Sequence, residues 1–471
     1  MTRVAIIGAG PAGLAAADYL SQFTKFKVEL FETGRRSKAR ICPVDRSLIC
    51  NGCSGTCNVL SGIGGCIQPD DSIKLSMFPS GRRLLKHIGV RQAAAAQGRA
   101  MDFFDVRSQN FAASTTERFG NLELRHYPIH EVDPKGVGKL HDKFELIAQK
   151  VHKFHARTRV LRLSHSPTGI EVHTADRTEK NQVFDKVIIA TGRTGFNSIL
   201  ENSDDLSITT SQPKISIGLR LELPANMLVS MFHAHKDFKF SKTYGEHKIK
   251  SFCFSSSGEM GGRLKFCHYD KQFDYPVTLL DGHANYESEK PSHVSGTTYG
   301  NLGLLVQLSD DCDTNWLNQI FLRHYFDECA GKPIVQSLGS FMKNCSDDKL
   351  ARVSVRDVRS GRVDKLFSAS QHTALKKSIQ DVLEGIEENS PFSFNQLLAE
   401  GSCVGPEVEF FWPTADVSKN LQTDVPGLYL AGDAVGIAQG NFQAAVSGLV
   451  AADGILRGEG VHFPTTEIAA E

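Results

Sequence analysis

Five of the eleven cysteines lie close together near the start of the chain, in a stretch rich in Gly, Ser and Asn. Their spacing is Cys-x7-Cys-x2-Cys-x3-Cys-x8-Cys, over Cys42, Cys50, Cys53, Cys57 and Cys66. The first four thiolates suit zinc or an iron–sulfur cluster, with Cys66 as an alternative ligand. Two cysteines could instead form a redox-active thiol pair, or one could donate a proton to a substrate. Small side chains also suit a tightly packed loop. The sequence does not favour a metal, but it leaves these alternatives open.

A glycine-rich turn follows directly after the first apolar run of the chain, residues 4–7. Gly8 permits a tight turn, Gly10 lets the backbone approach a pyrophosphate, and Gly13 allows a helix to pack closely on the strand. The alanine-rich run that begins at Pro11 predicts a helix, whose first amides and positive dipole end attract phosphate groups. Strand, turn and helix in this order predict a dinucleotide site.

A carboxylate stands at the end of the second apolar run, residues 28–31. Glu32 lies about twenty residues beyond the glycines, where a carboxylate can accept hydrogen bonds from ribose hydroxyls. The same carboxylate would repel a 2′-phosphate. The predicted nucleotide is therefore FAD or NAD rather than NADP.

Two later segments complete the argument for the cofactor. An apolar run over 187–190 ends in Thr191 and Gly192, where small residues let a dinucleotide pass close to the backbone. Near the end of the chain another strand leads into Gly432 and Asp433, followed by a helix. Asp433 is then expected beside the ribityl chain, and the helix N-terminus near the flavin, where its dipole stabilises negative charge on the reduced ring.

Three dinucleotide segments in this chain order predict FAD as the cofactor. Between residues 150 and 420 no strand leads into a second Gly-x-Gly-x-x-Gly turn. NAD(P)H, if used, is therefore expected only as a transient reductant that visits the flavin from the open face. The residues predicted to contact FAD are Gly8, Gly10, Pro11, Ala12, Gly13, Glu32, Asn58, Val160, Thr191, Gly192, Gly432, Asp433, Gly440 and Gln443.

The predicted fold class is α/β: a Rossmann-like FAD-binding domain of the two-dinucleotide type with an inserted, mainly antiparallel β substrate or cap domain. The period-two pattern of residues 214–223 is typical of a half-buried strand and indicates the insert. Short strands are predicted at 252–254 and 302–307, and helices at 315–330 and 371–388. The expected domains are residues 1–205 and 405–471 for FAD binding and residues 206–404 for the cap.

Charge and hydropathy limit the classes of function. Lys plus Arg and Asp plus Glu both number 53, so no excess charge indicates nucleic acid or a membrane surface as a partner. The first strand begins at residue 3, which leaves no room for a signal peptide, and no apolar run is long enough to span a bilayer. We expect a cytoplasmic protein with a small-molecule substrate, and the oligomeric state is left open.

Several stretches follow the pattern of one known family. They are Cys42-Pro43, Cys50 to Asn58, Ser61 to Gly65, Ile215 to Arg220, Phe252 to Glu259, Gly300 to Leu305, Gly405 to Phe411, and Gly432 to Gly448. On these stretches the chain resembles an uncharacterised family of FAD-dependent dehydrogenases that is distantly similar to the BaiN/RdsA-like flavoproteins. It departs from the family where the Gly64-Gly65 pair usually continues with Ala-Gly, and where Ser256 to Glu259 replaces Pro-Gly-Gly-Glu.

The resemblance and the FAD prediction together imply an FAD-dependent oxidoreductase, either a dehydrogenase or a reductase. It would transfer a hydride between the flavin and an organic substrate, with a C=C bond next to a carbonyl as the expected reacting group. Such chemistry needs a proton donor. The predicted candidates are first Cys57 and Cys53, then Ser256 and Glu259.

Two alternative functions are retained. One is a flavin-linked thiol–disulfide or iron–sulfur electron-transfer protein that uses the loop of residues 42–66. The other is a non-catalytic, FAD-containing binding protein. A flavin hydroxylase fits less well, because the Asp-Gly motif typical of aromatic hydroxylases is not found at a suitable strand end.

Overall fold

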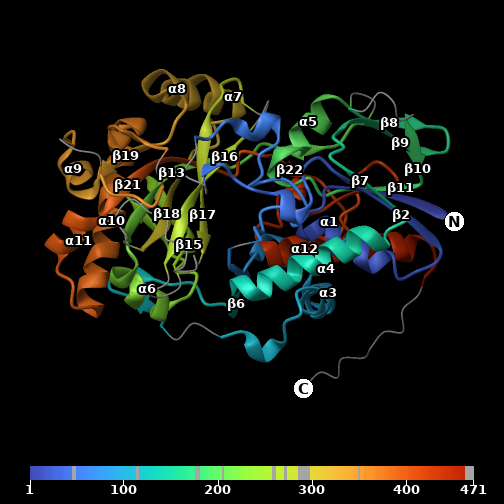
Figure 1. Ribbon diagram of the computed structural model, residues 1–471, viewed down its shortest axis with the longest axis horizontal. Helices are drawn as coiled ribbons and strands as arrows, with labels where there is room; N and C mark the ends of the chain where they lie inside the picture. Colours follow the sequence, from blue (N-terminus) through green and yellow to red (C-terminus); the bar gives the residue numbers. More distant parts are fainter. Residues whose placement is uncertain are drawn as a thin grey trace.

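The computed structural model consists of two units that lie side by side (Figure 1). One contains the N-terminus and the last helix of the chain, and the other is formed mainly by the middle of the chain. The structure describes residues 1–44, 49–69, 71–112, 116–175, 181–203, 206–256, 261–269, 273–284, 298–347, 351–355 and 357–461.

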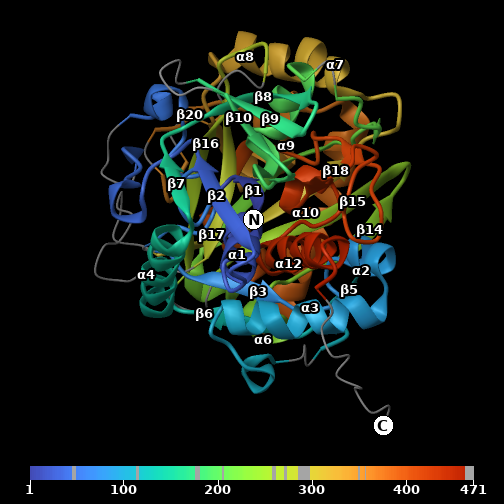
Figure 2. The ribbon, with the colours of Figure 1, turned by 90° about the vertical axis from the view of Figure 1, so that its right-hand side faces the viewer.

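The first unit is built on a five-stranded parallel sheet in the order β23-β11-β1-β2-β7. The strands are β1 (Thr2–Ile7), β2 (Phe26–Glu32), β7 (Lys153–Ala156), β11 (Lys186–Ile189) and β23 (Leu428–Leu430). Parallel strands that are apolar on both faces need cover on both faces. Helices provide it on one side and a small antiparallel sheet on the other (Figures 1 and 2).

The cover of this sheet accounts for most of the first unit. Its elements are α1 (Pro11–Leu20), α3 (Val90–Phe103), α4 (Pro134–Lys150), α12 (Asn441–Gly458), β8 (Val160–Ser166), β9 (Gly169–Thr174) and β10 (Gln182–Phe184). The predicted α/β class is confirmed.

The second unit is a seven-stranded sheet in the order β14-β15-β18-β13-β21-β19-β20, antiparallel except for its last pair. The strands are β13 (Ser216–Pro224), β14 (Ser241–Tyr244), β15 (His247–Ser255), β18 (Tyr299–Gln307), β19 (Ile334–Ser337), β20 (Arg359–Ser360) and β21 (Ser402–Glu409).

Two different layers cover this larger sheet (Figure 1). The outer face packs against α9 (Leu338–Lys343), α10 (Ala369–Asn389) and α11 (Phe394–Glu400). The inner face, toward the first unit, packs against a hairpin of β16 (Gly262–His268) and β17 (Thr278–Ala284). The seven-stranded sheet is therefore enclosed on both sides.

The enclosure corrects one prediction. β13 was expected to be half-buried, but all of its residues are buried. Its polar residues are compensated inside the protein: Arg220 donates to the carbonyl of Cys253 at 2.8 Å, and Glu222 accepts from the backbone of Ser354 at 2.7 Å. The period-two pattern is correct, but the β16–β17 hairpin covers the face that was expected to meet water.

Smaller elements complete the two units and the connections between them. They are β3 (Ile73–Ser76), β4 (Arg118–Phe119), β5 (Leu122–Glu123), β6 (Ile129–Val132), β12 (Thr210–Ser211), β22 (Thr414–Ala415), α2 (Arg82–Ile88), α5 (Phe196–Glu201), α6 (Val229–Ala234), α7 (Thr314–Trp316) and α8 (Arg323–Cys329). A π-helical turn over Leu317–Leu322 interrupts the helix predicted at 315–330. In the described part of the chain, no helix combines the length and apolarity required to cross a bilayer.

The expected boundary between residues 404 and 405 falls inside β21, which pairs with β13 and β19 in the seven-stranded sheet. The chain re-enters the parallel sheet only at β23. The division into domains remains a prediction, and this strand would move the second boundary beyond Glu409.

Close packing of α1 on α12 depends on Gly448, because a Cβ there would lie 2.0 Å from the carbonyl oxygen of Ala12. We expect Gly448→Ala to lower the free energy of unfolding by about 1–3 kcal/mol, the usual cost of overpacking. Denaturant unfolding measures this change. A Cβ at Gly458, in the same helix, would meet nothing within 4 Å, so Gly458→Ala should be at least as stable as the wild type. Equal stabilities of the two variants would contradict the close packing.

Candidate functional site

One cavity of about 590 Å³ is lined by residues of both units. The first unit contributes the glycine turn between β1 and α1, the end of β2 and the segment 190–195. The second unit contributes the ends of β15 and β17 and the residues that follow β21. The glycine turn and a set of polar side chains thus line the same cavity.

The three glycines of the turn have different reasons to be glycine. A Cβ at Gly8 would lie 2.4 Å from the Ala190 carbonyl oxygen, and one at Gly13 would lie 1.9 Å from the Gly8 carbonyl oxygen. A Cβ at Gly10, which lines the cavity, would approach only the Gly65 Cα, at 3.8 Å. The protein itself therefore leaves room at Gly10, and only a ligand in the cavity would require a glycine there.

Glu32 is a buried carboxylate at the wall of the cavity. It accepts backbone hydrogen bonds from Ala9 at 2.8 Å, from Gly34 at 2.6 Å and from Gly62 at 2.9 Å. It therefore joins the glycine turn to both ends of the loop that contains the cysteine cluster. Binding of a ribose by Glu32 remains a prediction.

The Gly432-Asp433 segment lies at the N-terminal end of α12 and lines the same cavity. The Gly432 amide donates to Ser447 Oγ at 2.8 Å, which fixes the turn to the helix. Gln443 Nε2 donates to the Ser76 carbonyl at 2.7 Å and so ties α12 to β3. Burial raises the pKa of Asp433 to about 6, although Arg193 opposes the shift.

All but two of the residues predicted to contact FAD line the cavity. Those that line it are Gly8, Gly10, Pro11, Ala12, Glu32, Val160, Thr191, Gly192, Gly432, Asp433, Gly440 and Gln443. Gly13 instead packs against the backbone of Gly8. Asn58 holds the cysteine loop, because its side-chain amide donates to the Ile41 carbonyl at 2.8 Å and its own carbonyl accepts from Arg40.

The cysteine cluster is spread over several surroundings. Cys57 and Cys66 line the cavity, whereas Cys42, Cys50 and Cys53 are not among its described lining residues. Within the described ranges, no group of three or more His, Cys, Asp and Glu side chains is arranged to hold a metal ion. The thiolate-metal alternative therefore has no geometric support.

Electrostatics separate the remaining two cysteine hypotheses. Burial raises the pKa of the Cys57 thiol. Burial also raises the pKa of Cys66 to about 11, against the opposing effect of the Arg193 guanidinium. Reactive cysteines normally have lowered pKa values. Both cavity cysteines are thus protonated thiols near neutral pH, which does not suit a thiol–disulfide relay.

The other predicted proton donors lie elsewhere. Ser256 is buried, and its carbonyl oxygen accepts from Lys74 Nζ at 3.0 Å, but the residue is not among the described residues that line the cavity. Glu259 falls outside the described residues. Of the four candidates, Cys57 alone is placed at the cavity by the described structure.

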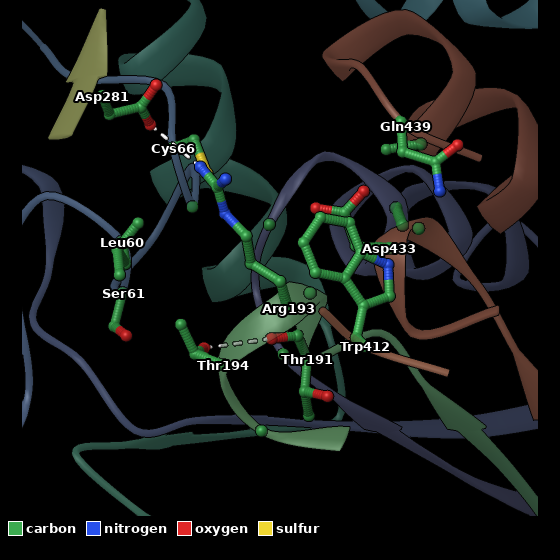
Figure 3. A pocket seen from close by; sticks show the side chains of 18 of the residues that line it. Leu60, Ser61, Cys66, Thr191, Arg193, Thr194, Asp281, Trp412, Asp433 and Gln439 are labelled. Atoms are coloured by element: carbon green, nitrogen blue, oxygen red, sulfur yellow. Dashed lines mark hydrogen bonds and ion pairs between the residues drawn. The ribbon is translucent and has the colours of Figure 1, made fainter. Parts of the chain in front are cut away.

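Three charged residues at the cavity wall were missed by the sequence analysis. Arg193 extends from the Thr191 turn toward Asp281, with Cys66 beside its guanidinium (Figure 3). Arg193 Nη2 lies 2.9 Å from Asp281 Oδ2, and the same guanidinium pairs with Glu409. Arg193 directly follows the predicted Thr191-Gly192 pair, which was the available signal in the sequence.

A second buried ion cluster fixes the β16–β17 hairpin. Asp71 lies 2.9 Å from Arg263 and 2.8 Å from both Lys265 and His283. Burial alone would raise the pKa of Asp71, but the facing cations hold it well below its usual range. His283 also lines the cavity. The hairpin is therefore anchored to the segment that precedes β3.

Comparison with known proteins agrees with this geometry. Residues 2–214 match the family model described as pyridine nucleotide-disulphide oxidoreductase. This segment contains the glycine turn, Glu32 and the Thr191 turn, and it carries the FAD-binding α/β fold of these oxidoreductases. The match bears out the predictions of an FAD-dependent oxidoreductase and of FAD as its cofactor. It does not name the BaiN/RdsA-like flavoproteins, so that resemblance remains a prediction.

No curated protein matches the chain. Among solved structures, it is similar to CtdE in complex with FAD and substrate 4, at 12% identity and a TM-score of 0.40, covering 95% of this chain and 78% of that one. It is similar to a putative FAD containing monooxygenase from Photorhabdus luminescens subsp. laumondii TTO1, at 12% identity and a TM-score of 0.44, covering 98% of this chain and 91% of that one. It is also similar to a salicylate hydroxylase substrate complex, at 13% identity and a TM-score of 0.43, covering 98% of this chain and 80% of that one.

The raised pKa values of the cavity thiols lead to a prediction. Iodoacetamide reacts with thiolates, so at pH 8 we expect Cys57 and Cys66 to be alkylated far more slowly than the exposed Cys345. Peptide mass spectrometry over a time course measures the three rates. Unfolding the protein in urea should equalise them. Alkylation of Cys66 as fast as that of Cys345 in the folded protein would contradict the assignment.

Proposed function

We propose that the protein transfers a hydride between FAD and a small organic substrate, at a C=C bond adjacent to a carbonyl. The observation that carries this proposal is the single cavity that joins the glycine turn to the polar wall of Arg193, Asp281 and Glu409. Hydride transfer requires the two reactants to meet in one space from which water is excluded. A separate nucleotide site and substrate site would not meet this requirement.

The residues present fit FAD. Gly10 leaves room that only a ligand would need, and the first amides of α1 would hold the pyrophosphate. Glu32 is proposed to bind the adenosine ribose, and Asp433 with the N-terminus of α12 would hold the flavin end. When bound, FAD supplies the hydride chemistry that amino-acid side chains lack.

The substrate end of the cavity favours a planar, largely apolar molecule. Aromatic side chains contribute much of this wall, and they are Phe252, Phe254, Tyr269, Phe273, Phe410 and Trp412. Aromatic faces bind planar groups by stacking. The polar groups of Arg193, Cys57 and Glu409 are among those that line the cavity and could contact a carbonyl oxygen. We infer a substrate with a conjugated carbonyl rather than a strongly charged one.

NAD(P)H is proposed as a transient reductant. Lys250 Nζ lies 5.8 Å from the centre of the Phe410 ring, which lines the cavity. Burial, together with the nearby cations Lys248, Arg125 and Arg83, lowers the pKa of Lys250 to about 8. Accumulated positive charge beside the cavity would attract the pyrophosphate of a nicotinamide dinucleotide.

Gly10→Ala tests the cofactor assignment. The new methyl group is tolerated by the protein, where it would meet only Gly65 Cα at 3.8 Å, but it would enter the cavity. We expect the variant to fold as the wild type does and to bind FAD at least tenfold more weakly, as measured by calorimetric titration of the flavin-free protein. Gly98→Ala in α3 has open space around the new Cβ and should bind FAD normally. Unchanged affinity in Gly10→Ala would exclude the proposed position of the pyrophosphate.

Anaerobic reduction of the FAD-loaded protein tests the reaction class. We expect NADH or NADPH to bleach the flavin absorbance, 2-cyclohexenone to restore it, and oxygen to restore it more slowly. A thiol relay would instead require two cysteines to become oxidised for each flavin reduced, which thiol titration detects. Fast reaction with oxygen through a peroxyflavin spectrum would replace the proposal with a monooxygenase, and absence of any reduction would favour a binding protein.

A further inference from the structure

Five buried charged residues form a continuous chain beneath the cavity. Arg193 pairs with Glu409 and with Asp281 at 2.9 Å. Arg220 lies 3.8 Å from the other oxygen of Asp281 and pairs with Glu407. The order is Glu409–Arg193–Asp281–Arg220–Glu407, with carboxyl groups at both ends. We refer to these five residues as the carboxyl ladder.

The carboxyl ladder holds more acid than base. It contains three carboxyl groups and two guanidinium groups, all buried. The groups that face its cavity end add a fourth carboxyl from Asp433, the thiol of Cys66 and the phenol of Tyr269. His283 faces Asp281 from the same strand. On β16, Arg263 and Lys265 pair with Asp71, which adds a further carboxylate to this buried region.

Unbalanced negative charge in a buried site is neutralised by protons. Asp281 stays ionised, because Arg193, His283 and Arg220 outweigh burial and lower its pKa. The two end carboxyls respond in the opposite direction: burial raises the pKa of Glu407 to about 8 and that of Glu409 to about 7. Glu407 Oε2 is buried with no partner among the described residues, as expected for a protonated carboxyl. The ladder thus retains a proton at neutral pH, shared between its ends.

One end of the carboxyl ladder reaches the cavity. Glu409 lines it, together with Arg193 and Asp281, whereas Glu407 and Arg220 are not among the described lining residues. A carboxylic acid at this position is a better proton donor near neutral pH than the thiols of Cys57 and Cys66, because efficient acid catalysis requires a pKa near the working pH.

We propose that Glu409 is the proton donor of the reaction and that Asp281 is a positioning residue whose negative charge keeps Glu409 protonated. This rests on the proposed function. In the reductive direction bound FAD would supply the hydride, and the substrate would take one proton from the Glu409 carboxyl group. The O–H bond of Glu409 breaks, and a C–H or O–H bond forms on the substrate. The Glu409 carboxylate is left beside Arg193 and regains a proton from water.

Infrared difference spectroscopy of the purified protein tests the protonation state directly. The wild-type minus Glu409→Gln spectrum should show a carboxylic acid carbonyl band at pH 6 and a carboxylate band at pH 9. Asp281→Asn removes a negative neighbour of Glu409 and should move this transition to lower pH. A carboxylate band at pH 6 would overturn the proposal. The infrared experiment does not need bound flavin, so it still measures the protonation state of Glu409 if the proposed function is wrong.

The pH dependence of the flavin midpoint potential tests whether this proton follows the redox reaction. In the FAD-loaded wild type we expect the slope of potential against pH to change near pH 7, and in Glu409→Gln we expect this change to be absent. Glu222→Gln is the matched control, because Glu222 is equally buried, has a pKa raised to about 7 by burial, and bonds to Ser354 away from the cavity lining. It should retain the change of slope. Persistence of the change in Glu409→Gln would overturn the role of Glu409.

The pH dependence of stability tests the protonation of Glu409 and shows whether Glu409→Gln folds. A raised carboxyl pKa in the folded state means that stability is highest below the unfolded value of about 4.5 and falls as pH rises toward about 7. Glu409→Gln removes this titration. The difference in melting temperature, wild type minus variant, should therefore decrease as pH rises from about 4.5 to about 7 and stay constant at higher pH. A constant difference throughout would contradict a protonated Glu409.

Discussion

The carboxylate of Glu32 accepts backbone hydrogen bonds from three segments: the glycine turn at Ala9, the start of the following loop at Gly34, and the end of that loop at Gly62. Buried amides left without acceptors cost about 1–3 kcal/mol each, so this one side chain determines how the loop returns across the turn. The return places Cys57 and Cys66 on the cavity wall and brings Gly65 against Gly10. The nucleotide end of the cavity and the cysteine loop are therefore parts of one arrangement.

The second unit completes the cavity with buried charge as well as with aromatic surface. Its seven-stranded sheet turns Arg220, Glu222, Glu407 and Glu409 inward, where the β16–β17 hairpin covers them. A buried polar layer of this kind is costly unless its members are paired. Here pairing is achieved across β13, β17 and β21, the Arg193 turn and the segment at Ser354. The carboxyl groups still outnumber the guanidinium groups, and this excess is the basis for proposing Glu409 as the proton donor. The aromatic residues beside it limit the substrates that could fit.

Local patterns were sufficient to predict the first unit. The glycine turn, its flanking strands and Glu32 are contiguous in the sequence, and the structure gives Gly8 and Gly13 steric reasons of their own. Prediction was wrong where burial depends on distant elements: the alternation of β13 is real, but it does not reveal the hairpin that covers it. The spacing of the cysteines suggested one common role, yet only Cys57 and Cys66 lie at the cavity among the described residues. Arg220 was predicted to lie in a strand, and Glu407 and Glu409 belong to a stretch that follows the family pattern. Which acid pairs with which base depends on the three-dimensional arrangement of the sheet.

The central claim is that FAD lies in the cavity shared by the two units, and a crystal structure of the protein grown with FAD tests it most directly. The account predicts density for the adenosine near Glu32 and Val160, for the pyrophosphate at the start of α1, and for the ring between Asp433 and Arg193. Crystals in which flavin is bound outside this cavity would contradict the claim. So would density that places the flavin ring near Glu32 and the adenosine near Asp433.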